Sequence, residues 1–311
     1  MFAEMINSNI CYSEDSAYAF VSGRIRFRER FFFDKERYER LLQETTENGF
    51  LSSLSDTFYG QFRGGDVLQT LSAAEWENHF FLKEYIHSSD LLKILLFPFD
   101  LHNLKLFSKG LKLKKDLSLY SSPFGYFVYP NFPPEIAELA ENPSFSDDQL
   151  EVTFFSQTYT IAQRFPFLVR YLSLLADVKN VLTLFRVIKF SLPSFQFLPY
   201  GHFSENFLSS LITLPIAEVP GKFPSPISEI LKEIIPFIIS GNFGFLRLEK
   251  RLNALVLSLL KKTRYATFGY EVLAAYYLSK RQEIENIRRI YLSRFVYQIT
   301  DLAILRELVI L

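Results

Sequence analysis

The stretch DVKNVLTLFR, from Asp177 to Arg186, contains the pattern that organises this sequence. The same spacing of an acidic residue and an asparagine occurs in DLHNLKLF, which begins at Asp100, and in EIENIRRI, which begins at Glu283. In all three stretches, the positions two before, one after and four after the asparagine are apolar, which predicts a helix with one buried stripe. The repeated polar residues are Asp100, Asn103, Asp177, Asn180, Glu283 and Asn286.

The first two copies also end alike. Gly125 and Gly201 stand at nearly the same distance after their asparagines, and each follows a proline and an aromatic residue. The copies are spaced far more widely than the ~20–50 residues of a solenoid repeat, but they suit small domains in series. We therefore predict three helical repeat domains, at residues 1–133, 134–220 and 221–311.

The chemistry of the repeated residues is predicted to be structural. A carboxylate at a helix start can cap free N–H groups, and Pro98 breaks the chain just before Asp100. Each copy therefore predicts a helix, a short turn and a second helix that starts at the acidic residue. Asparagine is a mediocre helix former, so its recurrence predicts a hydrogen bond that ties one helix to a neighbouring turn.

Most of the remaining sequence also predicts helices, because glycine is scarce and few segments alternate with a period of two. One long helix is expected over Ala73–Leu96, and two separate helices over Leu168–Leu175 and Asp177–Phe190. The clearest amphipathic helices are Leu246–Lys262 and Glu271–Val296. The fold class is therefore all-α.

Composition excludes several classes of protein. The 311 residues include 34 basic and 34 acidic side chains, so no chain-wide basic field is available for nucleic acid. The single cysteine, Cys11, rules out a disulfide scaffold and a cysteine-rich zinc site. No apolar stretch is long enough for a transmembrane helix, so we expect a soluble chain. With 34 phenylalanines, some of the rings are expected at interfaces.

No motif for catalysis or for cofactor binding is present. Gly221-Lys222 is followed by phenylalanine and does not continue as a phosphate-binding loop, and no dinucleotide fingerprint or HExxH appears. His79 and His87 are about two helical turns apart, too far to chelate one ion, and His102 and His202 are isolated. We predict no catalytic residue, no cofactor and no metal.

Arginines provide the remaining charged feature. Arg24 and Arg28, within a run of alternating arginines, would share one face of a helix, and acidic residues lie beside them. This favours a solvated or interface helix over a nucleic-acid patch. Arg288 and Arg289 follow the third asparagine and face either a partner or solvent. These four arginines are our candidate partner interface.

Longer stretches resemble a known family. YAFVSGRIRFRERFF (Tyr18–Phe32), YERLLQ (Tyr38–Gln43) and LSDTFYG (Leu54–Gly60) are similar to the opening of the C-type subunit of the V-type and A-type rotary ATPases, a family that includes the d-type subunit of the vacuolar enzyme. FGYEVLAAYYLSKRQEIENIRRIYLSRF (Phe268–Phe295) resembles the last domain of that family, and the first two repeat copies resemble its first two domains.

This resemblance implies a specific role. It implies an all-helical funnel of three domains with pseudo-threefold symmetry, bound at the cytoplasmic face of the membrane. It also implies that one copy joins the rotor shaft subunits, of D/F type, to the membrane proteolipid ring and couples them for proton or sodium transport, without an active site or cofactor.

The sequence features alone are also compatible with two other classes of function. A helical scaffold that binds other proteins would keep the repeats but have no central cavity and no rotary role. An enzyme built from scattered carboxylates and histidines would need a deep polar pocket that holds groups with perturbed pKa values.

Overall fold

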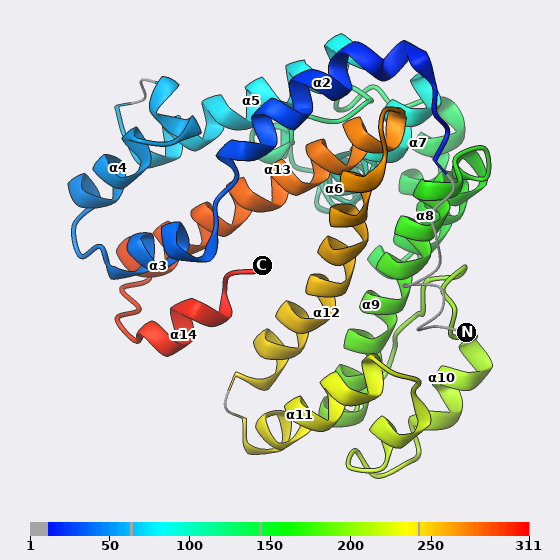
Figure 1. Ribbon diagram of the computed structural model, residues 1–311. Helices are drawn as coiled ribbons and strands as arrows, with labels where there is room; N and C mark the ends of the chain where they lie inside the picture. Colours follow the sequence, from blue (N-terminus) through cyan, green and yellow to red (C-terminus); the bar gives the residue numbers. More distant parts are fainter. Residues whose placement is uncertain (1–11, 63–64, 143–144, 242, 311) are drawn as a thin grey trace. The chain divides into compact units, whose positions relative to one another are not determined.

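The structure is a computed structural model that describes residues 12–62, 65–142, 145–241 and 243–310. Cys11 lies outside these residues. The described chain is helical and contains no strand, which confirms the all-α prediction (Figure 1). The chain divides into two compact units, Met1–Ile86 with Pro220–Leu311, and His87–Val219. We call them the terminal unit and the central unit; the three domain boundaries proposed from the sequence remain a prediction.

The terminal unit combines both ends of the chain. Its α-helices are α2 (Ala19–Arg28), α3 (Lys35–Gln43), α4 (Glu47–Ser55), α5 (Val67–Tyr85), α11 (Ile227–Ser240), α12 (Gly244–Lys261), α13 (Tyr270–Tyr291) and α14 (Leu302–Glu307). Short 3₁₀ turns are η1 (Ser16–Tyr18), η2 (Glu29–Phe31), η3 (Phe58–Gln61) and η6 (Lys262–Tyr265), and the π-helix η7 (Leu292–Val296) continues α13. In Figure 1, α13 lies along α5 and α2, and α11 and α12 form a hairpin beside it.

The core of the terminal unit explains why its two chain segments fold together. Phe50, Tyr59 and Leu71 from the N-terminal segment are fully buried against Ile287 and Ile290 of α13. Burying each large apolar side chain stabilises the fold by about 1.5–3 kcal/mol. The apolar stripe predicted for the third repeat copy is thus covered by residues more than two hundred positions earlier in the chain.

The central unit holds the first two repeat copies. Its α-helices are α6 (Ser89–Leu113), α7 (Pro134–Glu141), α8 (Asp147–Ala162), α9 (Pro166–Phe190) and α10 (Glu205–Leu211). The 3₁₀ turn η4 (Ser118–Tyr120) follows α6, and η5 (Val219–Lys222) begins where this unit ends. Asp100 and Asn103 lie within α6, and Asp177 and Asn180 lie within α9.

The predicted helix–turn–helix at each copy is wrong. Asp100, Asp177 and Glu283 all lie inside continuous helices; Ser88 caps the start of α6, and Pro98 lies inside that helix. The carboxylates do not cap helices, because the backbone amides that they accept from lie at least 25 residues away along the chain.

The helix predicted over Ala73–Leu96 is also interrupted. The chain leaves the helical conformation at Ile86 and re-enters it after Ser88, whose side chain accepts a hydrogen bond from the Leu91 amide. The predicted helices Leu246–Lys262 and Glu271–Val296 correspond to α12 and to α13 with its π-helical extension.

Candidate functional site

The asparagines of the first two copies make the same pair of bonds. In Asn103, the side-chain Nδ2 donates to the Ser122 carbonyl at 2.9 Å, and Oδ1 accepts from the Ser122 amide at 2.7 Å. In Asn180, the corresponding bonds to Leu198 measure 2.8 and 2.7 Å. Both asparagines are buried, so these bonds satisfy their amide groups as well as the backbone groups of Ser122 and Leu198. Each amide therefore fixes the segment that leaves its helix.

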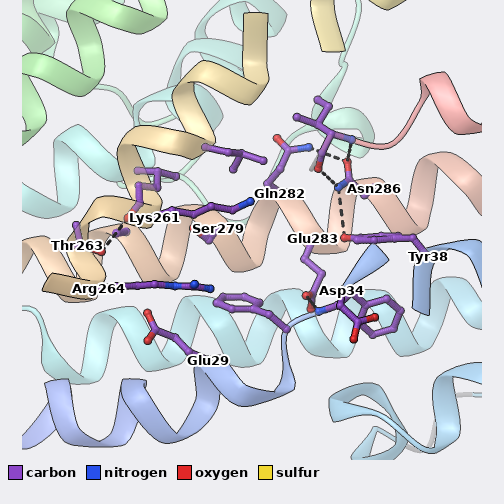
Figure 2. A pocket seen from close by; sticks show the side chains of 16 residues that line it. Glu29, Asp34, Tyr38, Lys261, Thr263, Arg264, Ser279, Gln282, Glu283 and Asn286 are labelled. Atoms are coloured by element: carbon purple, nitrogen blue, oxygen red, sulfur yellow. Dashed lines mark hydrogen bonds between the residues drawn. The ribbon is translucent and has the colours of Figure 1, made fainter. Parts of the chain in front are cut away.

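Asn286 binds in the same way within the terminal unit. Its Nδ2 donates to the Ile310 carbonyl at 2.8 Å, and its Oδ1 accepts from the Ile310 amide at 3.3 Å. Nδ2 also lies 3.3 Å from the Tyr38 hydroxyl oxygen, which accepts from it (Figure 2). The third copy thus uses the same asparagine chemistry on the last segment of the described chain.

The aspartates of the first two copies fasten the next part of the same segments. Asp100 Oδ1 accepts from the Phe127 amide at 3.0 Å. Asp177 Oδ1 accepts from the His202 amide at 2.7 Å, and its Oδ2 lies 2.5 Å from the His202 Nδ1. A β-carbon at Gly125 or Gly201 would come within 2.5 or 2.6 Å of the respective aspartate Oδ1. The shared glycines therefore leave room for a buried carboxylate.

The third copy has a longer acid that binds the N-terminal segment instead. Glu283 Oε2 accepts from the Phe33 amide at 2.6 Å, and Oε1 accepts from the Tyr59 hydroxyl at 2.7 Å. Lys280 Nζ lies 2.5 Å from the same Oε1 and only 3.9 Å from the centre of the Phe58 ring. Only 2% of the Lys280 side chain and 5% of the Glu283 side chain are exposed, so this is a buried ion pair.

The buried pair perturbs the groups around it. Burial lowers the pKa of Lys280, and the neighbouring Glu283 carboxylate opposes that shift. Burial, and then the Glu283 charge, raise the pKa of Tyr59 well above its ordinary value, so this hydroxyl stays protonated and donates to Glu283. These groups are satisfied by each other, as in a structural network.

Replacing Asn180 with leucine tests this account of the repeated residues. The variant leaves the Leu198 amide and carbonyl without their partners in a buried site, so we expect a loss of about 2 kcal/mol in the free energy of unfolding. Urea titration measures this loss. Asn206→Leu on the exposed side of α10 is the matched control and should change stability by less than about 0.5 kcal/mol. Equal stability of the two variants would contradict the assigned role.

The four candidate interface arginines all have partners within the terminal unit. Arg28 pairs with Glu77 at 2.7 Å and lies over the Phe81 ring, so it ties α2 to α5. Arg24 donates to the Tyr85 hydroxyl, and 42% of its side chain stays exposed. Arg288 pairs with Glu75 at 2.6 Å and Arg289 with Glu285 at 3.1 Å. Arg24 and Arg28 share the side of α2 that faces α5, whereas Arg288 joins α13 to α5.

Exposed aromatic side chains gather on the same two helices. In α2, Phe20 is 72% exposed and Phe27 is 59% exposed, and in α5 Phe80 is 60% exposed. Phe31 of η2 and Trp76 of α5 are also exposed, and Arg28 lines two hollows, one beside Phe20 and Phe27 and the other beside Trp76 and Phe80. We call Phe20, Phe27, Phe31, Trp76 and Phe80 the aromatic surface. The sequence predicted aromatic interfaces but did not identify these residues; the seven-residue spacing of Phe20 and Phe27 was a readable signal for two of them.

The histidines occupy unlike sites. His79 is buried, His102 is exposed with its Nε2 3.0 Å from the Tyr120 carbonyl oxygen, and His202 binds Asp177. Among the described residues, no group of three or more histidine, cysteine or acidic side chains is placed to hold a metal ion.

His79 should make stability depend on pH. Burial, with a smaller contribution from Lys83, lowers the pKa of His79 to about 4. The unfolded chain therefore binds a proton at this residue first, and the free energy of unfolding falls as pH drops from about 6.5 towards 4. His79→Phe should reduce the loss between pH 7 and pH 5 by about 1.5–2 kcal/mol, measured by urea titration. The exposed control His102→Gln should leave the pH dependence of the free energy of unfolding unchanged. If His79→Phe showed the wild-type pH dependence, His79 would not be its cause.

Comparison with known proteins agrees with the repeated structure. A family model described as the ATP synthase (C/AC39) subunit matches residues 21–127 and, a second time, residues 118–295. No match was found among curated proteins. Within the described residues, no helix is both long enough and apolar enough to cross a membrane. This family comprises non-catalytic subunits of V/A-type ATPases. The matched residues cover most of the sequence, so the chain belongs to the ATP synthase (C/AC39) subunit family.

Proposed function

We propose that this chain is the socket subunit of the central stalk of a V/A-type rotary ATPase. In this role it joins the rotor shaft to the membrane proteolipid ring and transmits torque during proton or sodium transport. The family match over most of the chain carries the proposal. The proposed arrangement is a funnel of three helical repeats that surround the end of the shaft.

The bonding of the repeats supports this role. A torque-transmitting part needs rigid connections, and the buried amides and carboxylates of the repeats fix the segments that follow α6, α9 and α13. Hydrogen-bonded networks in a low-dielectric interior resist deformation, because breaking any one bond leaves a buried polar group unsatisfied. The repeats therefore suit a mechanical function that requires no reactive group.

The proposed partners are the shaft subunits of D/F type and the proteolipid ring, with one copy of the chain in each complex. The proposed location is the cytoplasmic face of the membrane, where the subunit is bound peripherally. The aromatic surface of α2 and α5 offers a contact area for another subunit, since exposed apolar patches commonly mark protein interfaces.

Removal of the chain from its complex tests the proposal. We expect the chain to co-purify with shaft and ring subunits, and its deletion to abolish ATP-driven ion transport while ATP hydrolysis by the catalytic part persists. Adding back the wild-type chain should restore transport. Normal transport without the chain, together with no association with shaft or ring, would favour the scaffold alternative instead.

The aromatic surface can be tested separately. Phe20→Ser with Phe27→Ser should weaken assembly of the complex by at least tenfold, because buried aromatics often dominate interface affinity. The thermal midpoint of the isolated chain should change little, since both rings are largely exposed. Leu119→Ser, at a side chain that is 95% exposed in the central unit, is the matched control. Unchanged assembly in the double variant would exclude this surface as an interface.

A further inference from the structure

A cavity of about 330 Å³ opens within the terminal unit beside the third repeat copy (Figure 2). Lys261 at the end of α12 and Arg264 in η6 reach it from one side, and Asp34 and Tyr38 lie on the opposite side. Ser279, Gln282, Glu283 and Asn286 of α13 form its wall. The proposed role in a rotary complex does not account for this cavity.

The carboxylates that line the cavity are already engaged. Both oxygens of Glu29 accept from Arg26 Nη1, at 3.0 and 2.9 Å. Glu283 accepts from Phe33, Tyr59 and Lys280, as described above. Asp34 caps α3 by accepting from the Arg37 amide at 2.9 Å. The charges of Glu29 and Glu283 are therefore neutralised by Arg26 and Lys280, and neither of these cations lines the cavity.

The two cations that line the cavity are not engaged. Within the part of the chain that the structure describes, neither Lys261 nor Arg264 has an ion pair or a side-chain hydrogen bond. Cations at a helix C-terminus often serve its carbonyls, but here Arg26 Nη2 binds the Thr263 and Ala266 carbonyls at 2.7 Å each. The positive charge of Lys261 and Arg264 is thus available to the cavity.

A buried hydroxyl supplies a neutral donor to the same space. Tyr38 is 4% exposed, and its oxygen accepts from Asn286 Nδ2, while its own proton has no acceptor among the described residues. Burial, and then the Glu283 charge, raise the pKa of Tyr38 well above its ordinary value, so the hydroxyl keeps this proton. An unused donor in a buried site favours a ligand that brings an acceptor.

We propose that this cavity binds a compact anion with at least two negative charges, carried by phosphoryl or carboxylate groups, between Lys261, Arg264 and the Tyr38 hydroxyl. The volume lies at the lower end of the ~300–1,000 Å³ range of small-molecule sites, which suits a small ligand. Charge-assisted hydrogen bonds from lysine and arginine would hold its oxygens, and Leu257, Leu260 and Phe32 would contact any apolar part.

Isothermal titration of the complete chain tests this site with two probes, sodium pyrophosphate and sodium citrate, each against sodium chloride at equal ionic strength. We expect saturable one-to-one binding of at least one probe. Binding of pyrophosphate alone identifies a phosphoryl ligand, binding of citrate alone a carboxylate ligand, and binding of both the shared chemistry. Absence of saturable binding by both probes would overturn the proposal.

Variants locate the bound probe. Lys261→Ala and Arg264→Ala should each weaken binding about tenfold, since each removes one charge-assisted bond. Tyr38→Phe should weaken it several-fold. Lys232→Ala, an exposed residue on α11 that does not line the cavity, removes the same charge elsewhere and should have no effect. Wild-type affinity in both cation variants would place the anion outside this cavity and overturn the proposal.

A measurement on the wild-type chain avoids reliance on variants that fold poorly. Saturating probe should protect Lys261 from acetylation by an amine-reactive reagent, while Lys232 reacts at an unchanged rate, as followed by mass spectrometry. Equal protection of both lysines, or of neither, would contradict specific binding. Because it uses the isolated chain, the result is independent of whether the chain has a rotary role.

Discussion

Gly201→Ala should destabilise the central unit by about 3–4 kcal/mol, far more than one added methyl group usually does. The new β-carbon would lie 2.6 Å from Asp177 Oδ1, closer than real contacts allow. Asp177 is fully buried and is held by the His202 amide, so the carboxylate moves away only by losing this hydrogen bond. The backbone at Gly201 is not in the left-handed conformation, so alanine adds no backbone strain there. The expected destabilisation comes only from the contact between the new β-carbon and Asp177.

Two other glycines provide controls for this prediction. Gly221→Ala meets no atom within 4 Å, and Gly23→Ala in α2 meets none either. Gly23→Ala should even stabilise the chain by about 0.5–1 kcal/mol, because alanine is the better helix former. Urea titration ranks the three variants. Similar stability of Gly201→Ala and Gly221→Ala would show that the carboxylate is not fixed as described.

The equivalent position in the first copy extends the test. A β-carbon at Gly125 would lie 2.5 Å from Asp100 Oδ1, so Gly125→Ala should destabilise the chain to a similar degree. The two glycines stand in non-helical segments that sequence propensity alone would treat as tolerant. A similar loss at both positions would establish that the first two copies share one mechanism of attachment.

The repeated polar residues could be identified from the sequence, but the predicted helix start at each acidic residue was wrong. Aspartate is common at helix starts and proline breaks helices, so Asp100 after Pro98 looked like the beginning of a helix. In the structure, the Asp100 carboxylate is occupied by the Phe127 amide, and α6 continues past it. Local rules fail here because the partner of the carboxylate is 27 residues away.

The interruption between α5 and α6 was readable from the sequence. Ser88 is a favourable N-cap, and an acidic residue follows in the first turn, which together are typical of a helix start. The prediction of one helix over Ala73–Leu96 did not use this signal. By contrast, no local pattern could show that Phe33 and Tyr59 bind Glu283, because these pairs are separated by more than two hundred residues.

The arginines of α2 face a neighbouring helix. The spacing of Arg24 and Arg28 correctly indicated one face of a helix, but not that the face turns towards α5. Phe20 and Phe27 of α2 are exposed, whereas Val21 and Ile25 of the same helix are buried. Sequence periodicity identifies a stripe, whereas only packing decides which side of the helix is covered.

Lys280→Met should be the most destabilising change in the terminal unit, with an expected loss of about 3–5 kcal/mol. The methionine fills a similar volume, but it leaves the Glu283 carboxylate buried without its cation. Burial lowers the pKa of Lys280 and the Glu283 carboxylate opposes that shift, so desolvation of this buried pair offsets part of its attraction. The loss therefore comes from the orphaned carboxylate.

The double variant separates these two effects. In Lys280→Met with Glu283→Gln, the glutamine carries no charge and still accepts from the Phe33 amide, so most of the lost stability should return. Arg251→Met breaks the pair with Glu233, whose side chains are 51% and 53% exposed, and should cost less than about 1 kcal/mol. Urea titration of the wild type, Lys280→Met, Glu283→Gln and the double variant gives the coupling energy of the pair. A double variant no more stable than Lys280→Met would show that the lysine stabilises the fold by packing against the Phe58 and Tyr59 rings rather than by neutralising Glu283.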